Sequence, residues 1–182
     1  LASALVEKFA KELGEYEVVK TVKGTDLLGF KYKPLFPYFS EKLKNIPKLF
    51  SVLTGDFVTV EEGTGIVHMA PGFGEDDQAL CKANSIPTIC PVDEGGKFTE
   101  ETYDLETLSI KGRQVFETND DIIKYLKAQG SWLKTEQYLH NYPHCWRTDT
   151  PLIYRAIPSW YVKVTQFRDR MVQLNQQINW IP

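Results

Sequence analysis

The segment that most constrains the fold spans residues 63–77, because a β-strand pattern, a glycine-rich turn and an acidic helix start follow one another there without interruption. In its first half, the two-residue period of a strand places Ile66, His68 and Ala70 on one face. His68 therefore projects from an otherwise apolar surface, which is an unusual place for an imidazole. On spacing alone, such a residue is more often a core histidine bonded to the backbone than a catalytic group. Spacing leaves both interpretations open.

The second half of this segment predicts a turn followed by a helix. Pro71 ends the strand, while Gly72 and Gly74 permit backbone conformations that other residues resist. The acids at positions 75–77 then occupy the first turn of a helix through Ala83, where the helix dipole favours negative charge. Spacing does not choose among these acids, and their simplest role is to stabilise the helix start. A divalent metal site is not favoured, because no calcium-loop spacing surrounds them.

Helical patterns occur in three further places. Residues 2–13 carry apolar side chains at helical spacing, and Gly14 follows as a stop. A second helix begins after Thr118, has acids in its first turn, and ends at Gly130. Near the end of the chain, a helix places four apolar side chains on one side, at Phe167, Met171, Leu174 and Ile178.

Short strands are predicted between these helices. β-branched and aromatic residues lie between turn signals at residues 16–22, 57–60, 64–70, 88–92 and 131–139. The polar, turn-rich stretch 93–113 predicts a surface loop with a short hairpin. Several short strands without regular intervening helices indicate a barrel or sandwich, so the predicted fold class is mainly β (α+β).

Composition narrows the classes of function. The 182 residues are 42% hydrophobic, enough for one well-buried domain, and the net charge of −3 gives no case for a broad polyanion-binding surface. Three widely spaced cysteines, at positions 81, 90 and 145, form no disulfide framework and fit a reducing compartment. The sequence contains no apolar run of membrane-spanning length and no basic-then-apolar leader pattern, so a cytoplasmic protein without membrane contact is expected. The start at Leu1 instead of Met is consistent with a fragment.

Two long blocks carry a family resemblance: residues 63–77, and a second block that contains PHCWR (143–147), TPLI (150–153) and SWYV (159–162). Over essentially its whole length, the chain resembles the editing domain, or connective peptide 1, of class I aminoacyl-tRNA synthetases, and among these the isoleucyl enzyme of eukaryotic-cytoplasmic type. The valyl and leucyl enzymes look similar around residues 63–65 but lack a histidine at the place of His68. The resemblance implies a small β-barrel decorated with peripheral helices. Residues 1–164 would form the editing domain, and residues 165–182 a helix leading back to the catalytic domain.

The implied activity is hydrolysis of valine wrongly esterified to isoleucine tRNA. An apolar pocket discriminates only weakly against a substrate that lacks one methylene group, and isoleucyl enzymes are themselves the standard illustration of this limit. A second site must therefore remove what the first site accepts. By resemblance, Asp77 holds the α-ammonium of the mischarged group and His68 admits valine but rejects isoleucine. Phe73 belongs to the pocket loop, and Gly65 and Gly72 are neighbours of the terminal adenosine.

The motif has no serine or cysteine nucleophile next to a base, so hydrolysis is expected to use a positioned water and the terminal hydroxyl of the tRNA. Relatives carry a threonine-rich segment upstream of the counterpart of Leu1, and its threonines help form the same pocket. The chain is therefore expected to be a fragment truncated on its N-terminal side, with little or no editing activity alone. Many relatives also have a Cys-x-x-Cys zinc knuckle where this chain has Cys145 and Thr148. Because a structural zinc needs about four ligands, no metal is predicted, and no cofactor in this domain. ATP and magnesium would serve the parent enzyme.

The expected partners are the 3′ end of tRNA(Ile) carrying valine and the rest of the synthetase chain. Arg147, Arg155 and Lys163 are candidates for contacts with tRNA phosphates. An alternative from a different class is a noncatalytic module, in which the same fold only docks tRNA or supports the synthetase. The two hypotheses differ in whether Asp77 is needed to clear mischarged tRNA.

Overall fold

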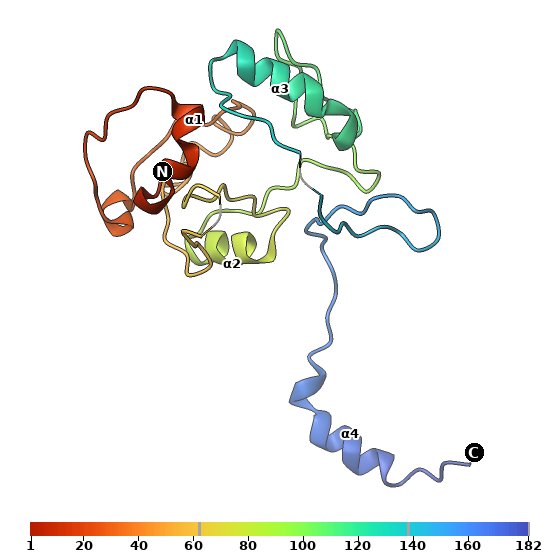
Figure 1. The fold of residues 1–182 in the computed structure, drawn as a ribbon. Helices are drawn as coiled ribbons and strands as arrows, with labels where there is room; N and C mark the ends of the chain where they lie inside the picture. The colour runs from red at the N-terminus through yellow and green to blue at the C-terminus, as the bar shows by residue number, and fades with distance from the viewer. Residues whose placement is uncertain (62, 138, 182) are drawn as a thin grey trace.

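The computed structural model describes residues 1–61, 63–137 and 139–181 (Figure 1). Its α-helices are α1 (Ala10–Leu13), α2 (Glu75–Ala83), α3 (Asn119–Ala128) and α4 (Arg168–Asn175). Short 3-10 turns lie at Ser3–Leu5, Glu7–Phe9, Gly24–Leu27, Val115–Thr118 and Val164–Gln166. Long irregular segments connect these elements, and α4 lies apart from the body that contains α1, α2 and α3.

The prediction of a mainly β fold with a β-barrel is wrong. Among the described residues no β-strand forms, and extended segments meet only in isolated antiparallel bridges, at Lys31↔Ser51, Val92↔Phe98, Lys97↔Gln114, Leu105↔Leu108 and His144↔Pro151. The segments expected as strands carry β-branched and aromatic residues, but a strand also needs a hydrogen-bonded neighbour along its length. Within residues 64–70, Ile66 and Val67 remain 61% and 49% exposed, so no sheet covers them. The last expected strand includes residue 138, which lies outside the described residues.

The most buried side chains gather in residues 92–118. Leu108 and Ile110 are 2% and 3% exposed, and Thr118 is fully buried. The short hairpin expected here is reduced to a turn, in which Asp93 N–H donates to the Lys97 carbonyl at 2.9 Å and Val92 meets Phe98 in an isolated bridge. The prediction of a surface loop for residues 93–113 is therefore wrong in part, since Leu108 and Ile110 turn inward and belong to the core while Tyr103 stays 45% exposed.

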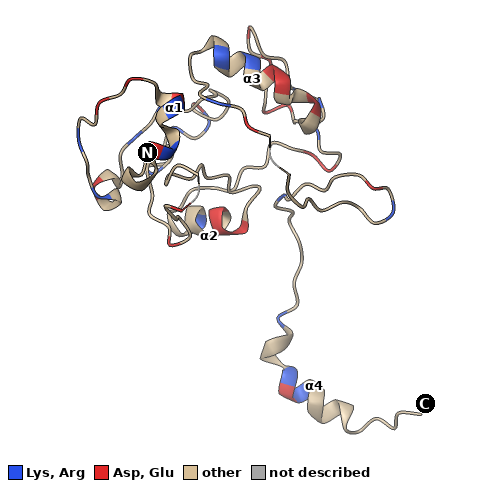
Figure 2. Ribbon diagram, viewed as in Figure 1, with Lys and Arg blue, Asp and Glu red and all other residues tan. Residues whose placement is uncertain are grey.

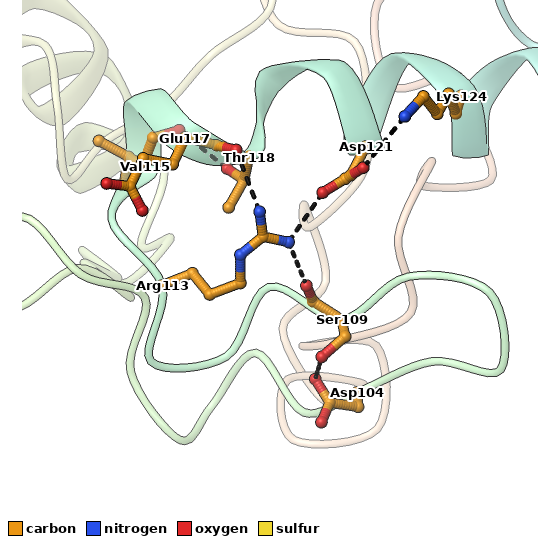
Figure 3. Close-up of polar contacts among 8 residues, drawn as sticks. All are labelled: Asp104, Ser109, Arg113, Val115, Glu117, Thr118, Asp121 and Lys124. Atoms are coloured by element: carbon orange, nitrogen blue, oxygen red, sulfur yellow. Dashed lines mark hydrogen bonds and ion pairs between the residues drawn. The ribbon is translucent and has the colours of Figure 1, made fainter.

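A polar cluster around Arg113 fixes α3 to this core (Figure 3). Its guanidinium donates to the Asp121 carboxylate at 2.8 Å, to the Ser109 carbonyl at 2.9 Å and to the Glu117 carbonyl at 3.1 Å. The Arg113 hydrogen bond holds the pKa of Asp121 below its ordinary value of 3.8. The predicted start of this helix after Thr118 is confirmed, although the Thr118 hydroxyl donates to Val115 instead of capping α3.

Aromatic rings join α3 to a loop much earlier in the chain, residues 34–47, which contains Pro34, Pro37 and Pro47. Phe36 stacks on both Tyr38 and Tyr125, with ring centroids 5.9 and 5.6 Å apart, and Tyr103 meets Tyr38 edge-on at 5.2 Å. Burial raises the pKa of Tyr38 to about 12. These contacts place the loop over the core of residues 92–118, to which the Arg113 cluster also attaches α3.

The helix expected at residues 2–13 is broken into two 3-10 turns and the single turn α1. Its predicted stop is confirmed, because Gly14 adopts φ +67° and its N–H donates to the Ala10 carbonyl at 3.1 Å. The N–H of Ala2 donates to the Thr64 carbonyl at 2.9 Å, which binds the start of the chain to the turn before residue 65.

The last part of the chain forms an extended arm that ends beyond α4 (Figure 1). Its last backbone hydrogen bond to the body among the described residues runs from Ala156 N–H to the Gly72 carbonyl, at 2.8 Å. The predicted domain boundary between residues 164 and 165 falls inside the 3-10 turn Val164–Gln166 and stays a prediction. No helix in the described part of the chain is long and apolar enough to cross a membrane.

Candidate functional site

A cavity of about 880 Å³ lies between segments of residues 23–69 and α2. Its walls come from residues 23–32, 51–58 and 64–69, together with Leu80 of α2. Most of the lining is aliphatic or aromatic, and the lining residues with ionisable side chains are Lys23, Tyr32 and His68. No carboxylate occurs among the described lining residues, so the cavity wall itself carries no negative side chain.

The middle wall of the cavity is positioned by backbone pairing with residues 29–32. Gly29 N–H donates to the Val52 carbonyl at 2.9 Å, and Val52 N–H donates to the Phe30 carbonyl at the same distance. A third hydrogen bond, from Tyr32 N–H to the Phe50 carbonyl, also measures 2.9 Å. Sequence reasoning missed this wall, because residues 51–58 contain no chemical motif and meet residues 64–69 only through the tertiary fold.

His68 lines this cavity and its side chain is exposed. No hydrogen bond or ion pair joins it to the residues that the structure describes. The interpretation of His68 as a core histidine bonded to the backbone is therefore wrong. Its imidazole is left available to whatever enters the cavity.

Gly65 also lines the cavity, at the turn that carries the strand-like segment into it. Its φ of +74° is a left-handed conformation that favours glycine, and a Cβ at this position would lie 2.5 Å from the Cβ of Ala2. The Thr64 hydroxyl donates to the Ile66 carbonyl at 2.9 Å and closes the same turn. Close packing against the start of the chain therefore requires a residue without a side chain here.

Asp77 lies outside the cavity lining, in the first turn of α2. Its Oδ2 accepts the N–H of Ala70 at 2.9 Å, and the Ala70 carbonyl accepts the N–H groups of Phe73 and Gly74 at 2.8 and 3.2 Å. Asp77 therefore closes the turn of residues 70–74 by a bond from its side chain. Leu80, three residues further along α2, does line the cavity, so Asp77 lies one helical turn from the cavity edge on the same side of the helix.

Gly72 and Phe73 also lie outside the cavity lining, within the turn that Asp77 closes. Gly72 is buried, and a Cβ there would lie 2.1 Å from the Ile89 carbonyl oxygen. Its own carbonyl accepts the N–H of Ala156 at 2.8 Å. Gly72 therefore has a packing role at the junction of three chain segments, and Phe73 is half-buried beside it.

The structure thus divides the predicted site into two adjoining groups. His68 and Gly65 face the cavity, whereas Asp77, Gly72 and Phe73 form the turn next to it. Negative charge gathers at the start of α2, as the red segment of that helix shows (Figure 2). A cation at the α2 edge of the cavity would therefore meet the acidic end of the site, and an apolar group would occupy its interior.

A smaller cavity of about 230 Å³ shares the wall of residues 51–54. Lys48 and Asn84 line it, and the Lys48 ammonium donates to the Asn84 side-chain oxygen at 2.7 Å. Its only charged lining group is therefore already hydrogen-bonded within the described part of the chain.

The region at Cys145 and Thr148, where many relatives would carry a zinc knuckle, forms a tight turn. Cys145 N–H donates to the Thr150 carbonyl and Asp149 N–H to the Cys145 carbonyl, both at 2.8 Å. Hydrogen bonds from the Thr148 hydroxyl and from the Arg147 and Thr148 amides lower the pKa of the Cys145 thiol. In the described residues no three His, Cys, Asp or Glu side chains gather in a group that could hold a metal. The expected absence of zinc stays a prediction, to be checked by elemental analysis of the purified chain.

Comparison with known proteins supplies the family context for this geometry. No protein-family model matches the chain. The isoleucine–tRNA ligase of Rickettsia felis is 63% identical over 184 residues, and that of Rickettsia bellii strain OSU 85-389 is 62% identical over 185 residues. Each alignment covers 100% of this chain but only 16% of the relative. These relatives are bacterial, so the expected eukaryotic-cytoplasmic type stays a prediction. Over its whole length, the chain is therefore similar to a segment that makes up about one-sixth of an isoleucine–tRNA ligase.

Proposed function

We propose that this chain is the part of an isoleucine–tRNA ligase that hydrolyses valine from mischarged tRNA(Ile). The observation that carries the proposal is the exposed, unbonded imidazole of His68 on the wall of a cavity of about 880 Å³. That volume lies within the range of sites that enclose small organic ligands. The similarity to isoleucine–tRNA ligases supplies the substrate class, a tRNA end that carries an amino acid.

The interior of the cavity suits a small aliphatic side chain. Leu53, Val58 and Ile66 contribute to a lining that is mostly apolar, so a valine side chain would be transferred there from water at a gain in free energy. In this proposal His68 sets the upper size limit, because its ring occupies space that an added methylene group would need. Such a gate works by steric exclusion and does not depend on the ionisation of the imidazole.

The α-ammonium of the aminoacyl group is assigned to the acidic edge at α2. The Oδ2 atom of Asp77 accepts the Ala70 N–H, whereas Oδ1 makes no hydrogen bond to the described residues. In the proposal, Oδ1 binds the ammonium at the cavity edge next to Leu80. The same carboxylate would then hold the 70–74 turn with one oxygen and the substrate with the other.

Water attack on the ester would be assisted by the tRNA itself. The described lining offers hydroxyls at Thr25, Tyr32, Ser51, Thr54 and Thr64, but no carboxylate that could act as a general base. We therefore assign proton transfer to the neighbouring terminal hydroxyl of the tRNA, with the cavity wall positioning the water. The water oxygen bonds to the ester carbonyl carbon, the ester C–O bond to the terminal ribose breaks, and the proton lost by the water passes through that hydroxyl to the departing ribose oxygen, which releases valine and uncharged tRNA. No cofactor enters this step, and ATP with magnesium would serve synthesis elsewhere in the ligase.

The proposed partners are the 3′ end of tRNA(Ile) carrying valine and the remaining ligase polypeptide. The cytoplasm is the proposed compartment, since all three cysteines are free thiols, as a reducing environment favours. No membrane partner is part of the proposal.

A second candidate function follows from the position of Asp77. Because this carboxylate lies outside the cavity lining and bonds to Ala70, its role is also compatible with a noncatalytic module that docks tRNA. In that case Asp77 would only maintain the shape of the surface. The two functions make opposite predictions for the clearance of mischarged tRNA.

The deciding experiment measures release of valine from valine-charged tRNA(Ile) by the full-length ligase. Asp77→Ala is expected to abolish this release while isoleucine charging stays normal. Asp76→Ala is the matched control, because Asp76 is an exposed neighbour in the same helical turn. Equal release by wild type and Asp77→Ala would remove this residue from the reaction and favour the docking module.

A further inference from the structure

Lys23 is the only lysine or arginine among the described lining residues of the cavity of about 880 Å³. It is exposed, and its Nζ makes no hydrogen bond or ion pair with the residues that the structure describes. Lys48, which lines the smaller cavity, instead donates to the Asn84 side chain. The Lys23 ammonium is therefore available to bind an anionic part of whatever enters the larger cavity.

The backbone of Lys23 is fixed by two reciprocal hydrogen bonds at the start of the 3-10 turn Gly24–Leu27. Lys23 N–H donates to Oδ2 of Asp26 at 3.1 Å, and Asp26 N–H donates to the Lys23 carbonyl at 2.9 Å. Lys23 contributes only backbone atoms to both bonds. A substitution of its side chain therefore leaves the turn, and the direction of the chain into the cavity wall, in place.

The cavity has room for more than one amino acid side chain. Its volume lies in the upper part of the range of roughly 300–1,000 Å³ that is typical of sites for drug-sized ligands. Lys23 belongs to the wall of residues 23–32, whereas His68 belongs to the wall of residues 64–69. A ligand that extends between these walls meets a cation on one of them and the imidazole on the other.

We propose that Lys23 binds the phosphate of the terminal tRNA nucleotide while the valyl ester of that nucleotide lies at the wall of His68. The inference rests on the proposed function, because it takes the mischarged tRNA end as the ligand. The valine carboxyl is esterified in this substrate, so the phosphate is its nearest anionic group. The phosphate is attached on the 5′ side of the ribose, away from the hydroxyls that carry the amino acid. A cation that binds it therefore belongs on a different wall from the size gate.

Lys23 acts as a positioning residue in this arrangement. A lysine ammonium is a compact charge with three donors, which suits the oxygens of a phosphate. The mostly apolar lining around it strengthens the attraction, because the cavity screens charge less than bulk water does. The ammonium touches no reacting atom of the ester. Its contribution is therefore to binding of the tRNA end and not to cleavage of the ester bond.

The kinetics of valine release by the full-length ligase test this assignment. With valine-charged tRNA(Ile), Lys23→Ala should raise KM about tenfold, the effect of one charge-assisted hydrogen bond, and change kcat little. Lys23→Arg keeps the charge and should recover most of the loss. The slope of log KM against log salt concentration should fall by about 0.7 in Lys23→Ala, because one phosphate contact is missing.

Lys20→Ala is the matched control, since Lys20 is an exposed lysine of the same segment that lies outside the cavity lining. This variant should keep the KM and the salt dependence of the wild type.

A phosphate-free substrate separates a contact with phosphate from an effect on the shape of the cavity. Adenosine with valine esterified to its ribose lacks the phosphate, whereas the same ester of adenosine 5′-monophosphate carries it. In the wild-type ligase, the ester with phosphate should have the lower KM for valine release. In Lys23→Ala, the two esters should have equal KM values.

Two results would overturn the proposal. One is an unchanged KM for valine-charged tRNA(Ile) in Lys23→Ala. The other is an equal loss on both small esters, which would assign Lys23 to the shape of the cavity or to an ion pair with ligase polypeptide outside these 182 residues. Failure of the proposed function gives a different result. Retained valine release by Asp77→Ala would remove the α2 edge from the reaction, while the phosphate-dependent difference at Lys23 would still be measured.

Discussion

The backbone N–H of Ala70 donates a hydrogen bond of 2.9 Å to Oδ2 of Asp77, across the glycine-containing turn that separates the cavity wall from α2. Met69, the preceding residue, lines the cavity, and so does Leu80 on α2. The bond therefore connects both sides of the cavity edge. A change at Asp77 should alter the shape of this edge as well as its charge.

Asp77→Asn should separate shape from charge. An asparagine keeps an oxygen that can accept the Ala70 N–H, so stability should change little. Asp77→Ala removes the acceptor and should lower the free energy of unfolding by about 1–2 kcal/mol. If Asp77 binds the ammonium, both variants should lose valine release from mischarged tRNA. Urea unfolding and deacylation assays measure the two effects, and full activity of the Asn variant would assign Asp77 to positioning alone.

His68→Ala should widen the cavity, because the imidazole projects from its wall without bonds to the described residues. We expect the full-length variant to hydrolyse isoleucine-charged tRNA as well as valine-charged tRNA. The decay of each ester, followed with radiolabelled amino acid, provides the measurement. His144→Ala serves as control, since His144 lies outside the cavity lining and bonds to the Tyr142 carbonyl. A stable isoleucine ester in the His68 variant would contradict the size-gate role.

Gly72→Ala should destabilise the chain, because the added Cβ would lie 2.1 Å from the Ile89 carbonyl oxygen. Overpacking of this kind costs about 1–3 kcal/mol, and a clash with backbone is at the upper end. Gly24→Ala is the matched control, since its Cβ would meet no atom within 4 Å. Denaturant unfolding of both variants checks the difference, and equal midpoints would show that the junction at Gly72 relaxes freely.

The attachment of α3 should weaken in acid. Because Arg113 holds the pKa of Asp121 below its ordinary value of 3.8, the stabilisation is fully present above that value and is lost as the pH falls through the lower folded pKa. Asp121→Asn lacks this carboxylate, so its deficit in thermal midpoint against wild type should shrink as the solution is acidified. Asp120→Asn, at an exposed position in the same turn, should show no such trend. A constant deficit for Asp121→Asn would argue against the ion pair as the cause.

Local sequence correctly predicted elements whose hydrogen bonds close within a few residues. The acidic start of α2, the beginning of α3 after Thr118, and the stops at Gly14 and Gly130 all occur where their patterns indicate. Each of these features depends on residues three to five positions apart, so neighbouring side chains are sufficient to determine it. His68 and Asp77 could be named as candidates from local sequence because they lie in one continuous motif, and their roles stay predictions.

Only the tertiary structure decided where the extended segments lie and which side chains form the core. The predicted strands needed distant hydrogen-bonding partners that the described chain does not align, so a β-barrel is absent there. Leu108 and Ile110 became core although their surroundings are polar, and the 51–58 wall meets His68 only through folding. Sequence by itself determined α2, α3 and the stops at Gly14 and Gly130, but not the helix expected at residues 2–13, which is broken into shorter turns. The cavity, and the separation of Asp77 from its lining, depend on contacts between residues far apart in the chain, which no local pattern encodes.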